Sequence, residues 1–306
     1  MKFRSFLTTV ATFSALAANP AFALSPQVFV SGKGADRAGC GTTTAPCRSF
    51  QYAHDAAVTA GGMIAVMDSG DYGPVKITKS VSIINNGAGV AAISAASART
   101  AIEIDIPSSG RVVLRGLTVD GGKTQDWGLR VPNAATLEIS KCVFRNFNQS
   151  GIALAGFTQL SFIIADTESS DNLRYGLEAT GPVSIDGVIR NSRFNRNGTG
   201  ISAGPSYRSI DPGVRLVVKG VEVNGANKGF AMWGYDPTRD VSTLAGVSIS
   251  NTSTALLASL SGALRVSRST FVNNNEVGGF GLVTSSGDNQ ASLYNVGPTM
   301  TVVPMK

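Results

Sequence analysis

Gly128-Leu129-Arg130-Val131 is the first copy of the phrase that decides the fold of this chain. The phrase consists of a glycine, an apolar residue, any residue, and a further apolar or small residue. Six more copies follow, one with alanine in place of glycine: Gly151-Ile152-Ala153-Leu154, Gly176-Leu177-Glu178-Ala179, Gly200-Ile201-Ser202-Ala203, Gly229-Phe230-Ala231-Met232, Ala255-Leu256-Leu257-Ala258 and Gly279-Phe280-Gly281-Leu282. Their spacings are 23, 25, 24, 29, 26 and 24 residues. A period in the twenties, carried by short β segments, predicts the stacked coils of one all-β solenoid.

An asparagine lies four to six residues before each phrase from the second copy on. These asparagines are Asn146, Asn172, Asn195, Asn224, Asn251 and Asn273. Asparagine tolerates the left-handed backbone conformation, and its side-chain amides can form a ladder when coils stack. We expect the following glycine to enter the next strand with a positive φ. The second residues of the phrases should form one apolar stack inside the coils: Leu129, Ile152, Leu177, Ile201, Phe230, Leu256 and Phe280.

Residues 1–23 have the pattern of a secretory signal peptide. Lys2 and Arg4 make a basic start, an apolar stretch follows, and Ala21-Phe22-Ala23 supplies small residues at the cleavage position. The apolar stretch is shorter than the roughly 20 residues that a membrane span needs. We therefore expect an exported protein, periplasmic or secreted, without a transmembrane segment.

Charge and cysteine content exclude several classes of partner and cofactor. The 26 basic residues less the two in the signal leave 24, which against 20 acidic residues gives a mature charge of +4. The basic residues are dispersed, so no nucleic-acid partner is expected, whereas an acidic glycan is allowed. Cys40 and Cys47 should form a disulfide in an oxidising compartment, and Cys142 should be a buried thiol. No cysteine or histidine set has metal-ligand spacing, so we expect no metal and no cofactor.

The segment that follows the cysteine loop has helical character. Ser49 to Ala60 is predicted to be a helix, with Ser49 as its N-cap and Gly61-Gly62 as its end. From Met63 on, short β runs are separated by Gly, Asn or Pro, and no helix-length periodicity returns.

These features together resemble the right-handed parallel β-helix of the pectin-lyase-like superfamily. The opening is similar to that of bacterial secreted members: Phe29-Val30-Ser31-Gly32, Cys40, then Ala45-Pro46-Cys47-Arg48-Ser49-Phe50-Gln51, the short helix and Gly61-Gly62. The resemblance implies a signal peptide at 1–23 and a single β-helix domain over 24–306. Within that domain, residues 28–62 would form an N-terminal cap, about 62–285 the coils, and 286–306 a C-terminal cap or tail. The superfamily includes lyases, hydrolases, epimerases and adhesins, so the fold leaves the activity open.

The sequence lacks the residues that several enzyme classes of that superfamily use for catalysis. Hydrolases that resemble polygalacturonases use aspartates with a Gly-His-Gly segment, but the single histidine, His54, lies in the predicted cap helix. The expected outward column contains one acid, too few for paired carboxylates: Arg130, Ala153, Glu178, Ser202, Ala231, Leu257 and Gly281. Pectate-lyase-like members use a basic residue as base and an acidic calcium site. The run from Arg190 to Arg196 could supply such a base or form a solvated corner, and no convincing calcium cluster accompanies it.

Two neighbouring loops form the best candidate site. Residues 204–212 follow the phrase at Gly200, and residues 233–240 follow the phrase at Gly229, so both should leave the same corner of adjacent coils. They gather aromatic and charged residues suited to sugars: Tyr207, Arg208, Asp211, Trp233, Tyr235, Asp236, Arg239 and Asp240. The alternative is that these residues only form turns and cover a coil edge.

Part of this corner also resembles an enzyme. Gly234-Tyr235-Asp236-Pro237 is similar to the Tyr-Gly-Phe-Asp-Pro-His segment of alginate C5-epimerases, with Thr238 where that family has histidine. We therefore expect an exported protein that binds an acidic polysaccharide or cell-envelope glycan without clear catalytic machinery. The alternative is a polysaccharide lyase or C5-epimerase acting on a uronate-containing glycan. The oligomeric state stays open.

Overall fold

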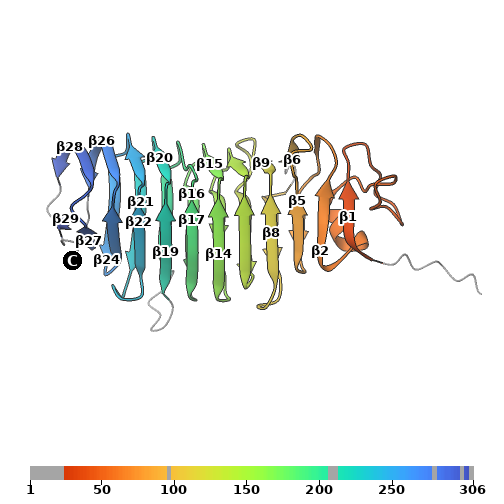
Figure 1. Cartoon of the computed structure of the whole chain (residues 1–306), viewed down its shortest axis with the longest axis horizontal. Helices are drawn as coiled ribbons and strands as arrows, with labels where there is room; N and C mark the ends of the chain where they lie inside the picture. The colour runs from red at the N-terminus through yellow and green to blue at the C-terminus, as the bar shows by residue number, and fades with distance from the viewer. Residues whose placement is uncertain (1–23, 95–97, 206–212, 278–280, 297–299, 303–306) are drawn as a thin grey trace, which may run out of the picture.

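The protein is a straight stack of parallel strands along one long axis (Figure 1). This computed structural model describes residues 24–94, 98–205, 213–277, 281–296 and 300–302. The expected signal peptide, residues 1–23, lies outside the described residues, as does the end of the expected C-terminal tail. The signal and the domain boundaries drawn from it therefore stay predictions.

Three parallel sheets make the walls of the stack. Among the described residues, sheet 1 has 12 strands in the order β1 (Ser25–Val30), β2 (Val58–Val66), β5 (Val81–Ile84), β8 (Arg111–Arg115), β11 (Thr136–Ser140), β14 (Leu160–Ala165), β17 (Ile185–Arg190), β19 (Val214–Lys219), β22 (Val241–Ala245), β25 (Ala263–Ser267), β27 (Leu282–Ser285) and β29 (Met300–Val302). Sheet 2 contains β4 (Val75–Ile77), β7 (Thr100–Asp105), β10 (Trp127–Asn133), β13 (Ser150–Leu154), β16 (Tyr175–Gly181), β18 (Thr199–Pro205), β21 (Lys228–Gly234), β24 (Thr254–Leu260) and β26 (Thr270–Val277), which also pairs with β28 (Gln290–Val296).

Sheet 3 is narrow because its strands are short. Its members are β3 (Gly70–Asp71), β6 (Ala91–Ser94), β9 (Leu117–Asp120), β12 (Val143–Arg145) and β15 (Glu168–Ser170). Isolated bridges at Arg193 continue it to β20 (Glu222–Asn224), β23 (Ser248–Ser250) and the start of β26. Each coil passes through sheet 2, sheet 1 and sheet 3 in turn, which confirms the predicted parallel β-solenoid.

Six of the seven phrases stack in one column of sheet 2. The paired residues are Leu129, Ile152, Leu177, Ile201, Phe230 and Leu256, all buried in the core. The seventh phrase was wrongly placed in this column. Its Leu282 begins β27 in sheet 1 and pairs with Ala263, because β26 already supplies the strand beside β24. Gly279 and Phe280 lie outside the described residues.

The glycines of the phrase have a different role from the predicted one. The predicted positive φ is wrong for the phrase glycines that the structure describes, since Gly128, Gly151, Gly176, Gly200 and Gly229 do not adopt it. They are needed because the backbone packs directly against the core: a Cβ on Gly176 would lie 2.7 Å from Asn197 Nδ2 and 2.7 Å from the Gly200 carbonyl oxygen. The positive φ angles belong to the preceding corners, as at Asn146 (64°) and Asn251 (54°).

The predicted asparagine ladder is present at one corner. Asn251 Nδ2 donates to Asn224 Oδ1 at 3.2 Å, and Asn273 Nδ2 donates to Asn251 Oδ1 at 3.4 Å. A second, buried step joins Asn172 Nδ2 to Asn197 Oδ1 at 3.0 Å. Amides stacked in this way satisfy corner groups that have no strand partner.

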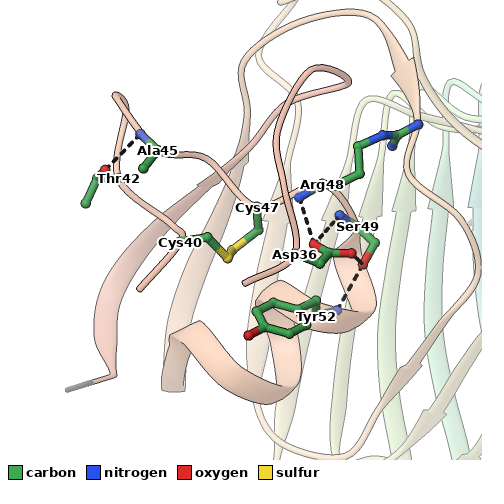
Figure 2. The surroundings of a disulfide bond; sticks show 8 residues. All are labelled: Asp36, Cys40, Thr42, Ala45, Cys47, Arg48, Ser49 and Tyr52. Carbon is green, nitrogen blue, oxygen red and sulfur yellow. Dashed lines mark hydrogen bonds between the residues drawn. A yellow bond between two sulfur atoms is a disulfide. The ribbon is translucent and has the colours of Figure 1, made fainter. Parts of the chain in front are cut away.

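A small cap covers the N-terminal end of the core (Figure 2). Cys40 and Cys47 form the predicted disulfide, and Cys142 is a buried free thiol whose pKa burial raises to about 11. The Asp36 carboxylate accepts from the Ser49 hydroxyl at 2.7 Å and from two backbone N–H groups. Ser49 in turn caps the helix by accepting from the N–H of Tyr52 at 3.2 Å, as predicted.

The cap helix is shorter than expected. It consists of one α-helical turn, α1 (Phe50–Tyr52), and one π-helical turn, η1 (Ala53–Ala57). The predicted end at Ala60 was wrong because Val58 already begins β2, where it pairs with Ser25 and is fully buried. β-Branched Val58 and Thr59 favour the extended backbone, so strand pairing wins over the helix here.

Candidate functional site

The two candidate loops follow neighbouring strands of sheet 2. Their parent strands β18 and β21 are neighbours, with Ala203 paired to Met232. At the return of the first loop, the Val214 N–H donates to Asp240 Oδ1 at 3.2 Å. Tyr207, Arg208 and Asp211 lie outside the described residues, so their part in a site stays a prediction. The described ends of segment 206–212 therefore flank the loop that contains Asp240.

Asp240 is the structural centre of the second loop. It is 1% exposed, and its Oδ2 accepts from the Tyr235 N–H at 2.7 Å and the Asp236 N–H at 3.2 Å. With Val214, three backbone donors converge on one carboxylate. A buried acceptor of this kind fixes a turn, and its oxygens are already occupied by the protein.

Asp236 and Arg239 shape the outer part of the same turn. Asp236 Oδ1 accepts from the N–H and the hydroxyl of Thr238, and these bonds hold the pKa of the Asp236 carboxyl below its usual value. Arg239 Nε lies 3.6 Å from Asp236 Oδ2. Thr238, which stands where the epimerase segment has histidine, thus serves as a hydrogen-bond partner of the turn.

The aromatic residues of this corner are presented to solvent. Trp233 is 38% exposed and Tyr235 is 40% exposed, while Gly234 between them is buried. The ammonium group of Lys228 lies 5.5 Å from the centre of a Trp233 ring. Lys228 and Trp233, both on β21, and Tyr235, in the turn fixed by Asp240, therefore place a cation and two exposed rings near one another.

Sequence reasoning missed a charged surface on the same sheet. Trp127 occupies the same column as Lys228, four strands away in β10, and the guanidinium groups of Arg99 and Arg130 lie 5.6 and 5.7 Å from its ring centre. Glu103 joins Lys76 at 2.9 Å and Arg130 at 3.6 Å. This surface could have been predicted from the position directly before the phrase glycine, which is Trp127, Tyr175 or Lys228 in three of the phrases.

A cleft of about 380 Å³ opens at the N-terminal end of this surface. It lies between the cap helix and strands β4 and β7, and its lining includes Gln51, Lys76, Arg99 and Glu103. Arg99 is also bonded to Asp126 at 2.6 Å. A guanidinium group has five N–H donors, so Arg99 and Arg130 each keep donors for a further partner in addition to their ion pairs.

Glu178 is the single acid in the expected outward column, and it is largely buried. Its Oε2 accepts from the Ser150 hydroxyl at 3.0 Å. Burial raises the pKa of Glu178, while that bond and the charge of Arg174 act in the opposite direction. The same column was predicted to face solvent, which is wrong for Ala153 and Ala231, at 2% and 1% exposed. Small side chains are covered when their neighbours in the column are long.

The other sequence candidates lie elsewhere. His54 is buried in the cap, and Arg196 is bonded to Asp171 at 2.7 Å at a corner beside sheet 3. Within the described ranges no group of three or more His, Cys, Asp or Glu residues could hold a metal ion. Across the same residues, no helix is long and apolar enough to cross a membrane.

Comparison with known proteins identifies the family. The model of the right-handed β-helix region matches residues 66–242, more than half of the chain. This protein belongs to the right-handed β-helix family. The predicted pectin-lyase-like fold is thereby confirmed, including the handedness of its coils.

Two solved structures are similar to this chain. Pectate lyase Pel9A superposes with a TM-score of 0.50 at 11% identity, over 91% of this chain and 80% of the lyase. The A-module of the mannuronan C-5 epimerase AlgE4 from Azotobacter vinelandii gives a TM-score of 0.46 at 11% identity, over 80% of this chain and 91% of the module. No curated protein sequence matches this β-helix protein.

Proposed function

We propose that this β-helix protein is exported and binds an acidic polysaccharide or cell-envelope glycan on the outer face of sheet 2, without turnover. The observation that carries the proposal is the exposure of Trp233, near the end of β21, and of Tyr235, in the turn whose backbone donates to the buried Asp240. Aromatic faces stack on sugar rings, and a preformed site loses little entropy on binding. Tyr207, Arg208 and Asp211, which lie outside the described residues, are proposed as further members of this site.

The charged surface around Trp127 extends the proposed site along the solenoid. Lys76, Arg99 and Arg130 offer donors to the carboxylates of a uronate polymer, and guanidinium groups bind carboxylates in a paired geometry. From β10 to β21 the sheet spans four strand steps, roughly 19 Å, which is room for several sugar units. A polymer running along the stack would contact both ends of the surface.

Binding is tested by calorimetric titration of uronate oligomers into the mature protein and a Trp233→Ala/Tyr235→Ala variant. The double variant should bind at least about 30-fold more weakly, since each ring is expected to contribute roughly 1 kcal/mol or more. Arg265→Ala, on β25 of sheet 1, is the matched control and should bind like the parent. Equal affinity of the double variant and the parent for every glycan would contradict the proposal.

Glu178 favours a second candidate, a lyase or C5-epimerase acting on the same class of polymer. A partly buried carboxyl whose pKa is raised by burial, on the face proposed to bind the polymer, is the kind of group that serves as an acid or base. For a lyase, the test follows the absorbance of unsaturated product from uronate polymers with and without calcium; for an epimerase, which forms no double bond, it follows the C5 configuration of the polymer by proton NMR. If the parent forms product and the Glu178→Gln variant does not, the protein is an enzyme and the proposal of binding without turnover is wrong.

Export is tested on material secreted by the native host. The mature chain should begin near Leu24, and mass spectrometry should find one disulfide, between Cys40 and Cys47. An intact N-terminus at Met1 in mature material would contradict export through a cleaved signal.

A further inference from the structure

The outer face of sheet 1 carries the net positive charge of the chain that follows the expected signal. Strands β8 to β25 present six exposed basic side chains there: Arg111, Arg115, Arg190, Arg215, Lys219 and Arg265. They present two acidic ones, Glu138 and Asp186. The difference is +4, and the other 18 basic and 18 acidic residues of positions 24–306 balance each other. This basic face therefore belongs to a chain that is otherwise neutral.

Both acidic side chains of the basic face are already paired. Glu138 accepts from Arg111 at 2.9 Å, and Asp186 accepts from Arg215 through two bonds of 2.6 and 2.9 Å. The other four cations of the face form no ion pair within the part of the chain that the structure describes: Arg115, Arg190, Lys219 and Arg265. Their charge is left for a partner outside the chain.

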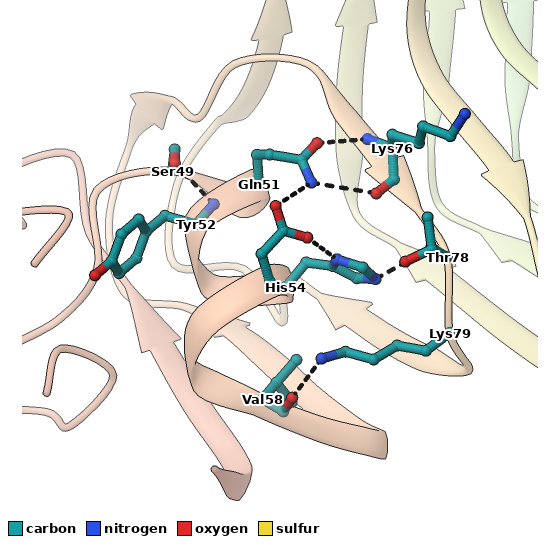
Figure 3. A network of polar contacts seen from close by, with 9 residues as sticks. Ser49, Gln51, Tyr52, His54, Val58, Lys76, Thr78 and Lys79 are labelled. Carbon is teal, nitrogen blue, oxygen red and sulfur yellow. Dashed lines mark hydrogen bonds and ion pairs between the residues drawn. The ribbon is translucent and has the colours of Figure 1, made fainter. Parts of the chain in front are cut away.

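Elsewhere the basic residues lie among an equal number of acids or bind the backbone. On sheet 2, Lys76 lies 2.9 Å from Glu103. In the cap, Lys79 donates to the Val58 carbonyl oxygen at 2.8 Å (Figure 3). The excess of positive charge is therefore concentrated on sheet 1.

An apolar strip runs along the middle of the basic face. Ile163, Val188 and Val217 pair on the successive strands β14, β17 and β19, and their side chains point outwards. Ile163 is 43% exposed and Val217 is 37% exposed. The three residues line a hollow of about 490 Å³. Cations lie on both sides of the strip, since Arg215 and Lys219 flank Val217 in the same strand.

We propose that the basic face of sheet 1 docks the protein on the surface of an anionic lipid bilayer. Arginine and lysine side chains pair with lipid phosphates, and an apolar strip between them packs at the boundary of headgroups and acyl chains. From β8 to β25 the sheet spans six strand steps, roughly 29 Å, so these side chains can meet a bilayer together.

The side chains of the basic face favour lipid over other polyanions. No outward side chain of strands β8 to β25 is aromatic, whereas sugar rings and nucleic-acid bases are bound by stacking on aromatic rings. A soluble polyanion would also leave the apolar strip in water, whereas a bilayer covers it. The proposed glycan site lies on sheet 2, so this inference does not depend on it.

The test is cosedimentation of the purified protein with vesicles of phosphatidylcholine, with and without phosphatidylglycerol. The parent should bind only the anionic vesicles, and salt should weaken binding by screening the charges. Arg190→Ala/Lys219→Ala should bind about 30-fold more weakly, equivalent to roughly 1 kcal/mol for each cation. As the matched control, Lys123→Ala/Arg193→Ala removes the same charge from exposed positions at and beside sheet 3 and should bind like the parent.

A second variant tests the apolar strip. Ile163→Ser/Val217→Ser should bind anionic vesicles several-fold more weakly with the salt dependence of the parent, because its charges are unchanged. Urea unfolding checks that every variant is folded. No binding of the parent to anionic vesicles, or an equal loss in the two double-cation variants, would overturn the proposal. Full vesicle affinity in Ile163→Ser/Val217→Ser would identify a general polyanion surface and would equally contradict it.

Discussion

At the scale of single residues, contact with the core decides what the repeat tolerates. Gly151, Gly176 and Gly200 have ordinary φ angles, yet a Cβ on any of them would overlap side chains or backbone of the neighbouring coil. Where the phrase has Ala255, the local packing admits the extra methyl group, and that residue is fully buried. Glycine is therefore needed at these positions because the backbone lies too close to the neighbouring coil for a Cβ atom.

Gly176→Ala should destabilise the protein by about 1–3 kcal/mol, the usual cost of forcing extra atoms into a packed core. Its Cβ would meet both Asn197 and the Gly200 backbone, and backbone cannot move aside cheaply. Urea unfolding measures the change. Thr180→Ala in the same strand is the control, since Thr180 is only partly buried, and it should change stability by less than about 0.5 kcal/mol.

Glu178→Gln should stabilise the protein at neutral pH. Because the pKa of Glu178 is raised in the folded state, its contribution to the free energy of unfolding is fully present below its pKa in the unfolded chain, about 4.3. That contribution is lost as the pH rises through its pKa in the folded protein. Glutamine removes the cost of a buried charge. Thermal unfolding of parent and variant should therefore differ at pH 7 and converge near pH 4, and an equal difference at both pH values would contradict the assignment.

At the scale of elements, short segments are held by a few polar contacts rather than by their own propensity. Asp240 organises the turn after β21, and Asp36 with Ser49 organises the start of α1. The cap has little regular structure, so its disulfide and these carboxylates replace the hydrogen-bond ladders of the coils. Such elements are stable only in their tertiary context.

Reduction of the Cys40–Cys47 disulfide should cost about 2–3 kcal/mol, as expected from closure of a loop with a sequence separation of 7. Urea unfolding with and without reductant measures the loss. Cys142→Ala should respond to reductant as the parent does, because Cys142 forms no disulfide. No effect of reductant on the stability of the parent would contradict a stabilising role for the bridge.

At the scale of the whole molecule, three parallel sheets enclose one continuous core, and carboxylates join distant parts of it. Asp68 accepts from the Ser31 hydroxyl, the Gly32 N–H and the Tyr72 hydroxyl, and these bonds hold its pKa below the usual value. Arg196 lowers the pKa of Asp171 through a bidentate ion pair. Such bonds contribute stability that is fully present above the unfolded pKa of aspartate, about 3.9.

The unfolding temperature should therefore fall as the pH drops from about 4 through the lowered pKa values of Asp68 and Asp171. Asp68→Asn should have a lower unfolding temperature at neutral pH and a shallower decline in acid, which calorimetry at a series of pH values can measure. A decline as steep as that of the parent would show that Asp68 is not one of the groups responsible.

The repeated phrase alone determined the fold class, because a solenoid is built from contacts between residues one period apart and these are visible in sequence. The disulfide, the Ser49 cap and the asparagine ladder followed from the same local chemistry. Tertiary structure decided the rest. Val58 lies in β2 and not in the helix because it pairs with Ser25 of β1. Leu282 lies in sheet 1 because β26 already occupies the position beside β24 in sheet 2. The hydrogen-bond partner of His54 is the backbone N–H of Thr78, 24 residues later in the chain. Each outcome depends on a pairing between coils or with the cap, and no periodicity in the sequence encodes that competition.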